Sequence, residues 1–130
     1  MTSTAPAARR PQRIPLVLAV SATLAAGTAV SAANNTSAFN HRKSTGSATS
    51  WSRHAYGMAI DINPIENPYV TRSGRVDPIA DKAFTNRARP RPGMLTPGSA
   101  GVKAFTAAGW KWGGAWTSAK DYQHFSNDGR

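Results

Sequence analysis

Two short frames contain most of the side chains that can do chemistry. The first has the pattern SxHxxGxAxD, begins at Ser52, ends at Asp61 and carries His54. The second is the Asp-Tyr-Gln-His stretch from Asp121 to His124. Two imidazoles and one carboxylate can form a zinc site with three protein ligands and a fourth position open to water. A second carboxylate, three residues before the last histidine, can act as the base for that water.

The scarcity of these residue types strengthens the interpretation. The chain has three histidines and six carboxylates, and the two frames contain two of each. A lone histidine is more often a surface or core residue than a ligand, but two histidines in such frames favour a metal site. Cysteine is absent, so any metal must be bound through nitrogen and oxygen atoms.

Several motifs in the same order resemble a family of zinc peptidases that cut peptidoglycan stem peptides. This is the D-alanyl-D-alanine carboxypeptidase and L-alanyl-D-glutamate endopeptidase family, which shares its fold with the hedgehog signalling domain. The resemblance covers about residues 33–130, with its motifs at residues 34–42, 52–63, 109–114 and 121–125. It implies a small α+β fold, with an antiparallel sheet flanked by helices, and we expect a monomer.

The resemblance also implies a role for five side chains. His54, Asp61 and His124 would hold Zn²⁺. Asp121 would take a proton from the attacking water and pass it to the leaving amine. Arg42 would steady the oxyanion, because a guanidinium can donate two hydrogen bonds to developing charge. The implied substrate is the stem peptide. The sequence leaves open whether terminal D-Ala is removed or an internal bond is cut, and His₂Asp also accepts other divalent ions.

Three further residues are candidates for substrate contact. Ser52 either holds a neighbouring loop or touches the substrate. Trp110 and Trp112 lie on one face of an expected strand, where we expect Trp110 to pack in the core and Trp112 to line the substrate site. Trp116 lies close to Asp121 in the sequence and is the third candidate.

The length limits how the chain can be stabilised. A chain of 130 residues forms one domain at most, with a limited core. Small domains commonly need additional cross-linking, and disulfides are excluded here. A bound metal would serve, because metal binding to the folded state adds to folding free energy.

Residues 1–32 have the pattern of a secretory signal peptide. A basic stretch at residues 9–13 precedes an uncharged apolar run that continues to about residue 30, and Val30-Ser31-Ala32 is a small-residue cleavage site. Residues 33–130 would then form the zinc peptidase domain, with less chain before the site than relatives usually have. Two alternatives are a membrane anchor, which the short run with its Ser and Thr residues disfavours, and a helix of the folded domain over residues 14–30.

The net charge suggests an anionic partner. The formal charge is +10, and removal of the three N-terminal arginines leaves +7. For an exported protein the anionic cell wall fits this charge better than nucleic acid, for which no recognised motif is present. Part of the charge lies in residues 87–91, which can equally form a solvated loop with no partner.

The clearest strand pattern covers residues 57–63. Its alternation predicts that Met58, Ile60 and Ile62 face the core and that Asp61 faces the cleft. The Pro-rich residues 64–98 would form one wall of the cleft or a mobile loop, with a short helix between residues 79 and 89.

The C-terminal part predicts one further helix and a bend. The helix would begin at Pro97 or Ser99 and end at a Gly109 cap. Asp121 and His124 do not share a face of a regular strand, so a bend must bring their side chains together.

Three rival interpretations remain. The chain could be a non-catalytic wall-binding module of the same fold, or a truncated relative with an incomplete fold. A basic nucleic-acid binder is permitted by the charge alone.

Overall fold

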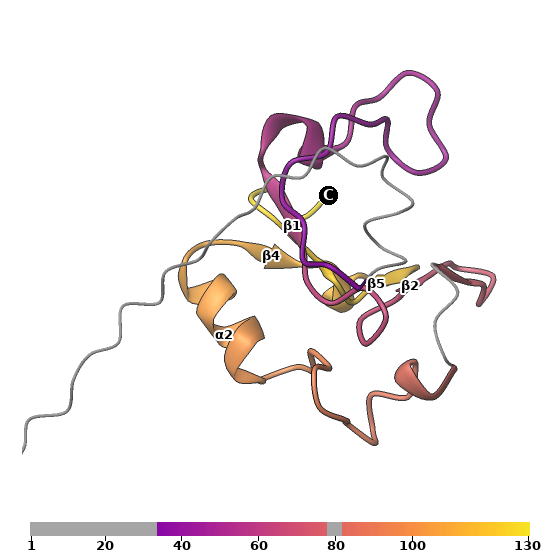
Figure 1. Ribbon diagram of the computed structural model, residues 1–130, viewed down its shortest axis with the longest axis vertical. Helices are drawn as coiled ribbons and strands as arrows, with labels where there is room; N and C mark the ends of the chain where they lie inside the picture. The colour runs from indigo at the N-terminus through magenta and orange to yellow at the C-terminus, as the bar shows by residue number, and fades with distance from the viewer. Residues whose placement is uncertain (1–33, 78–81) are drawn as a thin grey trace, which may run out of the picture.

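A computed structural model describes residues 34–77 and 82–130 of the chain (Figure 1). The expected signal peptide and the alternative helix over residues 14–30 lie outside the described residues. Among the residues described, no helix is long and apolar enough to cross a membrane.

Ten short elements make up the described chain, where η denotes a 3₁₀ turn. In order they are η1 (Arg53–Tyr56), β1 (Ala59–Asp61), β2 (Tyr69–Val70), β3 (Val76–Asp77), η2 (Lys82–Phe84), α2 (Ala100–Ala107), β4 (Lys111–Trp112), η3 (Gly113–Ala115), β5 (Lys120–Asp121) and β6 (His124–Ser126). The strands pair antiparallel in two sheets of three, with orders β1-β6-β4 and β3-β2-β5. This is a small α+β fold.

The expected arrangement of one sheet flanked by helices is only partly correct. Residues 122 and 123 interrupt the C-terminal strand region, so that β5 joins β2 while β6 joins β1. The chain therefore passes from one sheet to the other at this bend. In the described ranges α2 is the single α-helix.

The sheet β1-β6-β4 separates the core from the candidate site. Ile60, Phe125 and Trp112 lie in register across its three strands. Opposed residues on paired strands point to the same face, and alternate residues point to opposite faces. Ile60, Phe125 and Trp112 therefore form a core row, whereas Asp61 and His124, which also lie opposite each other, point the other way.

The helix α2 covers the core face of this sheet (Figure 1). Val102 is buried in the same cluster as Ile60 and Phe125, and the Phe105 ring stacks on Phe125 with centroids 4.4 Å apart. Ser99 is the N-cap residue, and Gly109 follows the helix in the left-handed conformation. The helix predicted from the 97–109 pattern is confirmed.

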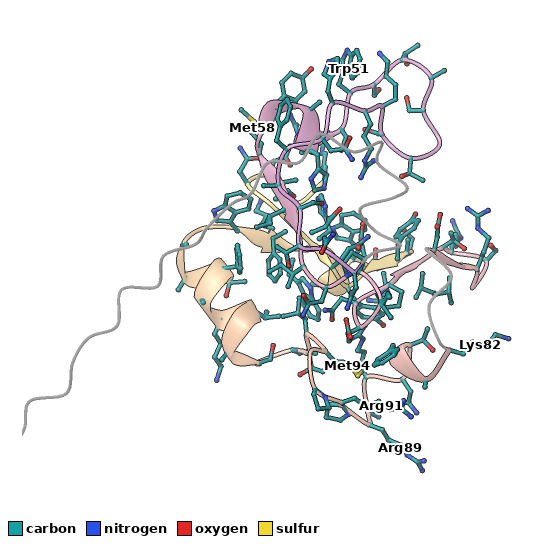
Figure 2. All side chains as sticks on the ribbon, viewed as in Figure 1. Trp51, Met58, Lys82, Arg89, Arg91 and Met94 are labelled. Atoms are coloured by element: carbon teal, nitrogen blue, oxygen red, sulfur yellow. The ribbon has the colours of Figure 1, made fainter. Side chains whose placement is uncertain are left out.

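Met58 does not face the core as the strand pattern predicted. It is 42% exposed, and Figure 2 shows it at the edge of the molecule near Trp51. Met58 precedes β1, which begins at Ala59, so the alternation of the strand does not extend to it. Within β1 all three residues are buried. The Met58 amide instead donates to the carbonyl of Arg53, the first residue of η1.

The Pro-rich excursion is tied to the core through Asn67. This side chain is fully buried and donates to the carbonyls of Ile62, Asn63 and Gly93, while its oxygen accepts from the Leu95 amide. These four contacts, with a fifth from Arg87 Nη1 to the same oxygen, hold the two ends of the excursion together. Of the helix expected between residues 79 and 89, the described residues contain only the three-residue turn η2.

The basic stretch at residues 87–91 is not uniformly solvated. Arg89 and Arg91 are exposed, at the opposite edge of the molecule from Met58 (Figure 2). Arg87 is partly buried, donates to Asn67 Oδ1 and the Glu66 carbonyl, and lies 3.9 Å over the Tyr122 ring. Arg87 is therefore a structural cation beneath the bend that separates the two sheets.

Candidate active site

The turn η1 delivers His54 to the site. The Ser52 hydroxyl accepts a hydrogen bond from the His54 amide and so caps the turn. Gly57 ends the turn with φ of 67°, a left-handed conformation that glycine adopts without strain. The cap and the glycine together make a tight reversal that leads the chain directly from His54 into β1.

Asp61 and His124 come from the paired strands β1 and β6. They are direct cross-strand partners, and both are buried. Their side chains consequently meet on the face of the sheet opposite the core row. His54 reaches the same place from η1.

The three potential ligand atoms form a nearly equilateral triangle. His54 Nε2 lies 3.3 Å from His124 Nδ1 and 3.2 Å from Asp61 Oδ1. His124 Nδ1 lies 3.1 Å from the same oxygen. Ligands bound about 2.0–2.1 Å from a tetrahedral zinc ion are separated by about 3.3–3.4 Å. The donor types and their spacing therefore fit a divalent metal ion, and in the described residues this is the one such group found.

Backbone carbonyls select the nitrogen that each imidazole presents. The Ala38 carbonyl lies 2.8 Å from His54 Nδ1, and the Arg130 backbone oxygen lies 2.9 Å from His124 Nε2. Because a main-chain oxygen can only accept, these two nitrogens must carry the protons. In the neutral rings, the lone pairs then lie on His54 Nε2 and His124 Nδ1, which are the two nitrogens of the triangle.

The buried charges of the triangle influence one another. Burial acts to raise the pKa of Asp61, but hydrogen bonds with His124 and His54 and the charge on these rings lower it well below its ordinary value. Burial acts to lower the pKa of His124, but its hydrogen bond with Asp61 and the charges of Asp121 and Asp61 raise it above the ordinary value. Asp61 is thus ionised and ready to bind a cation.

Asp121 has the opposite behaviour. Burial and the negative charge of Asp61 raise the pKa of Asp121 to about 7, against the smaller opposing effects of His124 and Arg42. Its Oδ1 atom is buried without a hydrogen-bond partner in the described structure. A carboxyl group with a pKa near neutrality can both accept and donate a proton at physiological pH.

Two glycines of η3 allow the site to close tightly. A Cβ atom at Gly113 would lie 2.7 Å from the Asp121 carbonyl oxygen and 3.3 Å from His124 Cβ. A Cβ atom at Gly114 would lie 2.2 Å from Cζ2 of the Trp112 indole. A larger residue at position 113 would displace the segment that carries Asp121 and His124, and one at position 114 would displace the Trp112 indole.

Arg42 lies near the site, and its charge lowers the pKa of Asp121. In the described chain, the one side-chain hydrogen bond of Arg42 is a long one, 3.4 Å from Nη1 to the Lys43 carbonyl. Its backbone is held by pairing with Ser52. Most of the guanidinium donors therefore have no partner among the described residues.

The three candidates for substrate contact have different positions. Trp112 is buried in the core, and its Nε1 donates to the Tyr122 carbonyl. This corrects the expected role of Trp112, because the strand β4 directs its indole toward the core row. Ser52 is also buried and serves as the cap of η1, which favours its structural role.

Trp116 alone of these three remains beside the site and partly exposed. Its ring centroid lies 5.8 Å from that of His124. It also lines an open pocket together with neighbouring residues of the same loop and two residues of the C-terminal turn: Ala115, Thr117, Ser118, Gly129 and Arg130.

Sequence reasoning missed the groups that orient the two histidines. The Ala38 and Arg130 contacts use main-chain oxygens, which every residue possesses and which therefore leave no signal in the sequence. It also missed Asp128, whose carboxylate pairs with Arg53 next to His54. The pattern offered no hint that the last residues return to the site.

Comparison with known proteins agrees with this geometry. The sequence pattern of the D-alanyl-D-alanine carboxypeptidase family matches residues 45–127, which is more than half of the chain. No curated protein and no solved structure matches at a significant level. The matched region contains His54, Asp61, Asp121 and His124, and the resemblance expected from the motifs is confirmed. The chain therefore belongs to the D-alanyl-D-alanine carboxypeptidase family of peptidases.

Proposed function

We propose that the protein is an exported zinc metallopeptidase that hydrolyses peptide bonds in the peptidoglycan stem peptide. The observation that carries this proposal is the triangle of His54 Nε2, Asp61 Oδ1 and His124 Nδ1, with edges of 3.1–3.3 Å. The second nitrogen of each ring is engaged by a carbonyl, as expected for metal-ligating histidines. When bound, zinc would polarise the substrate carbonyl and activate water as a nucleophile.

Asp121 is the general acid and base in this proposal. With a pKa of about 7, its carboxylate can accept a proton from the attacking water. The resulting carboxylic acid can then donate that proton to the leaving amine. Its unpartnered Oδ1 atom is consistent with a group that completes its hydrogen bonding only when substrate and water are present.

Arg42 and Trp116 serve the substrate. The Arg42 guanidinium has donors free for the oxyanion of the tetrahedral intermediate, and charge-assisted donors in a site of low polarity stabilise such an anion strongly. Trp116 lines the open pocket beside His124, where its indole can pack against the peptide.

One observation favours a second candidate, a non-catalytic wall-binding or shortened relative. The family match begins at residue 45 and does not include Arg42. The cation that would stabilise the oxyanion therefore lies outside the matched region. The basic charge of the chain would still favour attachment to an anionic wall.

Digestion of purified muropeptides, with products identified by mass, tests the two candidates. The wild-type protein should release a terminal alanine if it is a D,D-carboxypeptidase, or split the stem after its first residue if it is an endopeptidase. Asp121→Asn should form either product at least about 100 times more slowly, and Lys103→Gln, on the exposed side of α2, should behave as the wild type. Binding to the wall by a zinc-loaded wild-type protein that forms no product would overturn the peptidase proposal in favour of the second candidate.

A further inference from the structure

The four residues after β6 return to the candidate metal site. The Asn127 amide donates to the Met58 carbonyl, and the Gly129 amide donates to the Ser126 hydroxyl. The turn ends with the Arg130 backbone oxygen 2.9 Å from His124 Nε2. The C-terminal end accordingly lies beside β1 (Figure 1).

Asp128 connects this turn to the other histidine of the site. Its Oδ1 atom accepts from the Arg130 amide at 3.1 Å. Its Oδ2 atom pairs with Arg53, which precedes His54 in η1. One carboxylate therefore contacts both the residue that orients His124 and the turn that carries His54.

We propose that Asp128 is a positioning residue that holds the Arg130 main-chain oxygen against His124 Nε2 and thereby directs His124 Nδ1 toward the metal. The proposal rests on the metal site of the proposed function. Its physical reason is that a hydrogen bond to the far nitrogen of a metal-bound imidazole sets both the ring orientation and the proton position. The Arg53–Asp128 pair is partly exposed, with side chains 36% and 30% accessible, so its contribution to global stability should be small.

The first experiment follows the His124 Nε2 proton by nitrogen-15 NMR in the metal-free protein. Only three histidines are present, so His41→Gln and His54→Gln variants suffice to assign the rings. Asp128→Ala should make the His124 Nε2 proton exchange faster with solvent, by tenfold or more. The His54 Nδ1 proton, which is held by Ala38, should keep its rate and serves as an internal control.

The second experiment measures zinc affinity by competition with a chromophoric chelator. Asp128→Ala should weaken zinc binding by up to about 10–100-fold, the effect of losing the contact between Arg130 and the ligand His124. Asp128→Asn should lose less, because its amide oxygen can still accept from the Arg130 amide. Asp77→Ala removes an exposed carboxylate that pairs with Arg75 rather than with either ligand histidine, and it should leave the affinity unchanged.

The outcomes separate this proposal from the proposed function. Unchanged exchange of the His124 Nε2 proton in folded Asp128→Ala would overturn the positioning role. If exchange accelerates as expected but the wild-type protein fails to bind zinc, the positioning of His124 stands and the metallopeptidase proposal fails. Arg53→Lys provides a second variant, which should retain the ion pair and exchange slowly.

Discussion

His54 Nε2 lies 3.3 Å from His124 Nδ1, although 70 residues separate the two in the sequence. The pair meets because β1 and β6 are antiparallel neighbours and η1 is joined to β1 by a tight turn at Gly57. A metal bound between them would therefore link two distant parts of a small chain. The catalytic proposal and the stability of the fold consequently depend on the same three side chains.

Removal of one ligand should cost both metal and stability. We expect about one zinc per molecule in the wild-type protein and none in His54→Ala. Because binding and folding are linked, zinc at 1,000 times its dissociation constant would stabilise the wild type by about 4 kcal/mol, and His54→Ala should lose this increment. Elemental analysis and denaturant unfolding with and without a chelator measure the two effects.

His41→Ala is the matched control for this experiment. His41 is exposed and stacks on Trp51 with ring centroids 4.3 Å apart, outside the ligand triangle. It should keep its zinc and its chelator-sensitive stability. A wild-type protein that stays free of zinc after titration would contradict the metal site itself.

Asp121→Asn should separate catalysis from metal binding. The variant cannot accept the proton of the attacking water, so kcat should fall by a factor of about 10²–10⁴. Its zinc content should remain that of the wild type, since Asp121 supplies none of the three ligand atoms of the triangle. Loss of zinc together with activity would show that Asp121 is a ligand and would exchange the proposed roles of the two carboxylates.

The stability of the metal-free protein should fall as the pH rises through neutrality. The pKa of Asp121 is about 7 in the folded protein and about 3.9 in an unfolded chain, so the folded state binds more protons between these values. The free energy of unfolding should therefore decrease from about pH 4 to about pH 7. The raised pKa of His124 continues this decrease above about pH 6.5, its unfolded value. The lowered pKa of Asp61 affects stability only in more acidic solution.

Unfolding in the presence of a chelator, at several values between about pH 5 and pH 8, measures this dependence. Asp121→Asn should reduce the decrease in the free energy of unfolding below pH 7. The part of the decrease that is lost should be no more than about 4 kcal/mol, because one pKa unit corresponds to about 1.4 kcal/mol. Zinc-loaded protein should show the reverse trend, since the ligands bind as deprotonated groups. Increasing stability of the metal-free wild type over this range would contradict the assignment.

Two tryptophans near the site should respond differently to substitution. Trp112→Phe should lower stability, by roughly 1–3 kcal/mol, because a smaller ring leaves space in the cluster with Phe125 and against Gly114. Trp116→Ala should leave the melting temperature nearly unchanged but raise KM, since the indole lines the open pocket. Thermal unfolding and steady-state kinetics on a stem peptide test the pair. A normal KM in Trp116→Ala would remove this residue from the substrate site.

The sequence predicted side-chain chemistry better than it predicted architecture. The histidines and carboxylates were recognisable because their types are rare and closely spaced, and the α2 region has ordinary helix-ending signals. The split into two sheets was not predictable, because strands of two or three residues carry no measurable alternation. Met58 is a second example: the alternating pattern placed it in the strand, but the strand begins one residue later, at Ala59. Arg87 resembled the solvated Arg89 and Arg91 until its contacts with Asn67 and Tyr122 were visible.

Export should leave a mature chain that begins near Ala33. The prediction follows from the basic stretch at residues 9–13, the uncharged apolar run after it and the Val30-Ser31-Ala32 exit. Cleavage after Ala32 would keep Asn34, whose side chain contacts the folded domain by donating to Glu66 and accepting from the Ile65 amide. Mass spectrometry of protein secreted by a bacterial host measures the terminus, and Ala32→Arg should block cleavage while leaving the residues of the site untouched. Recovery of active protein from the cytoplasm with Met1 or Thr2 at its terminus would contradict export and would favour a helix of the folded domain over residues 14–30.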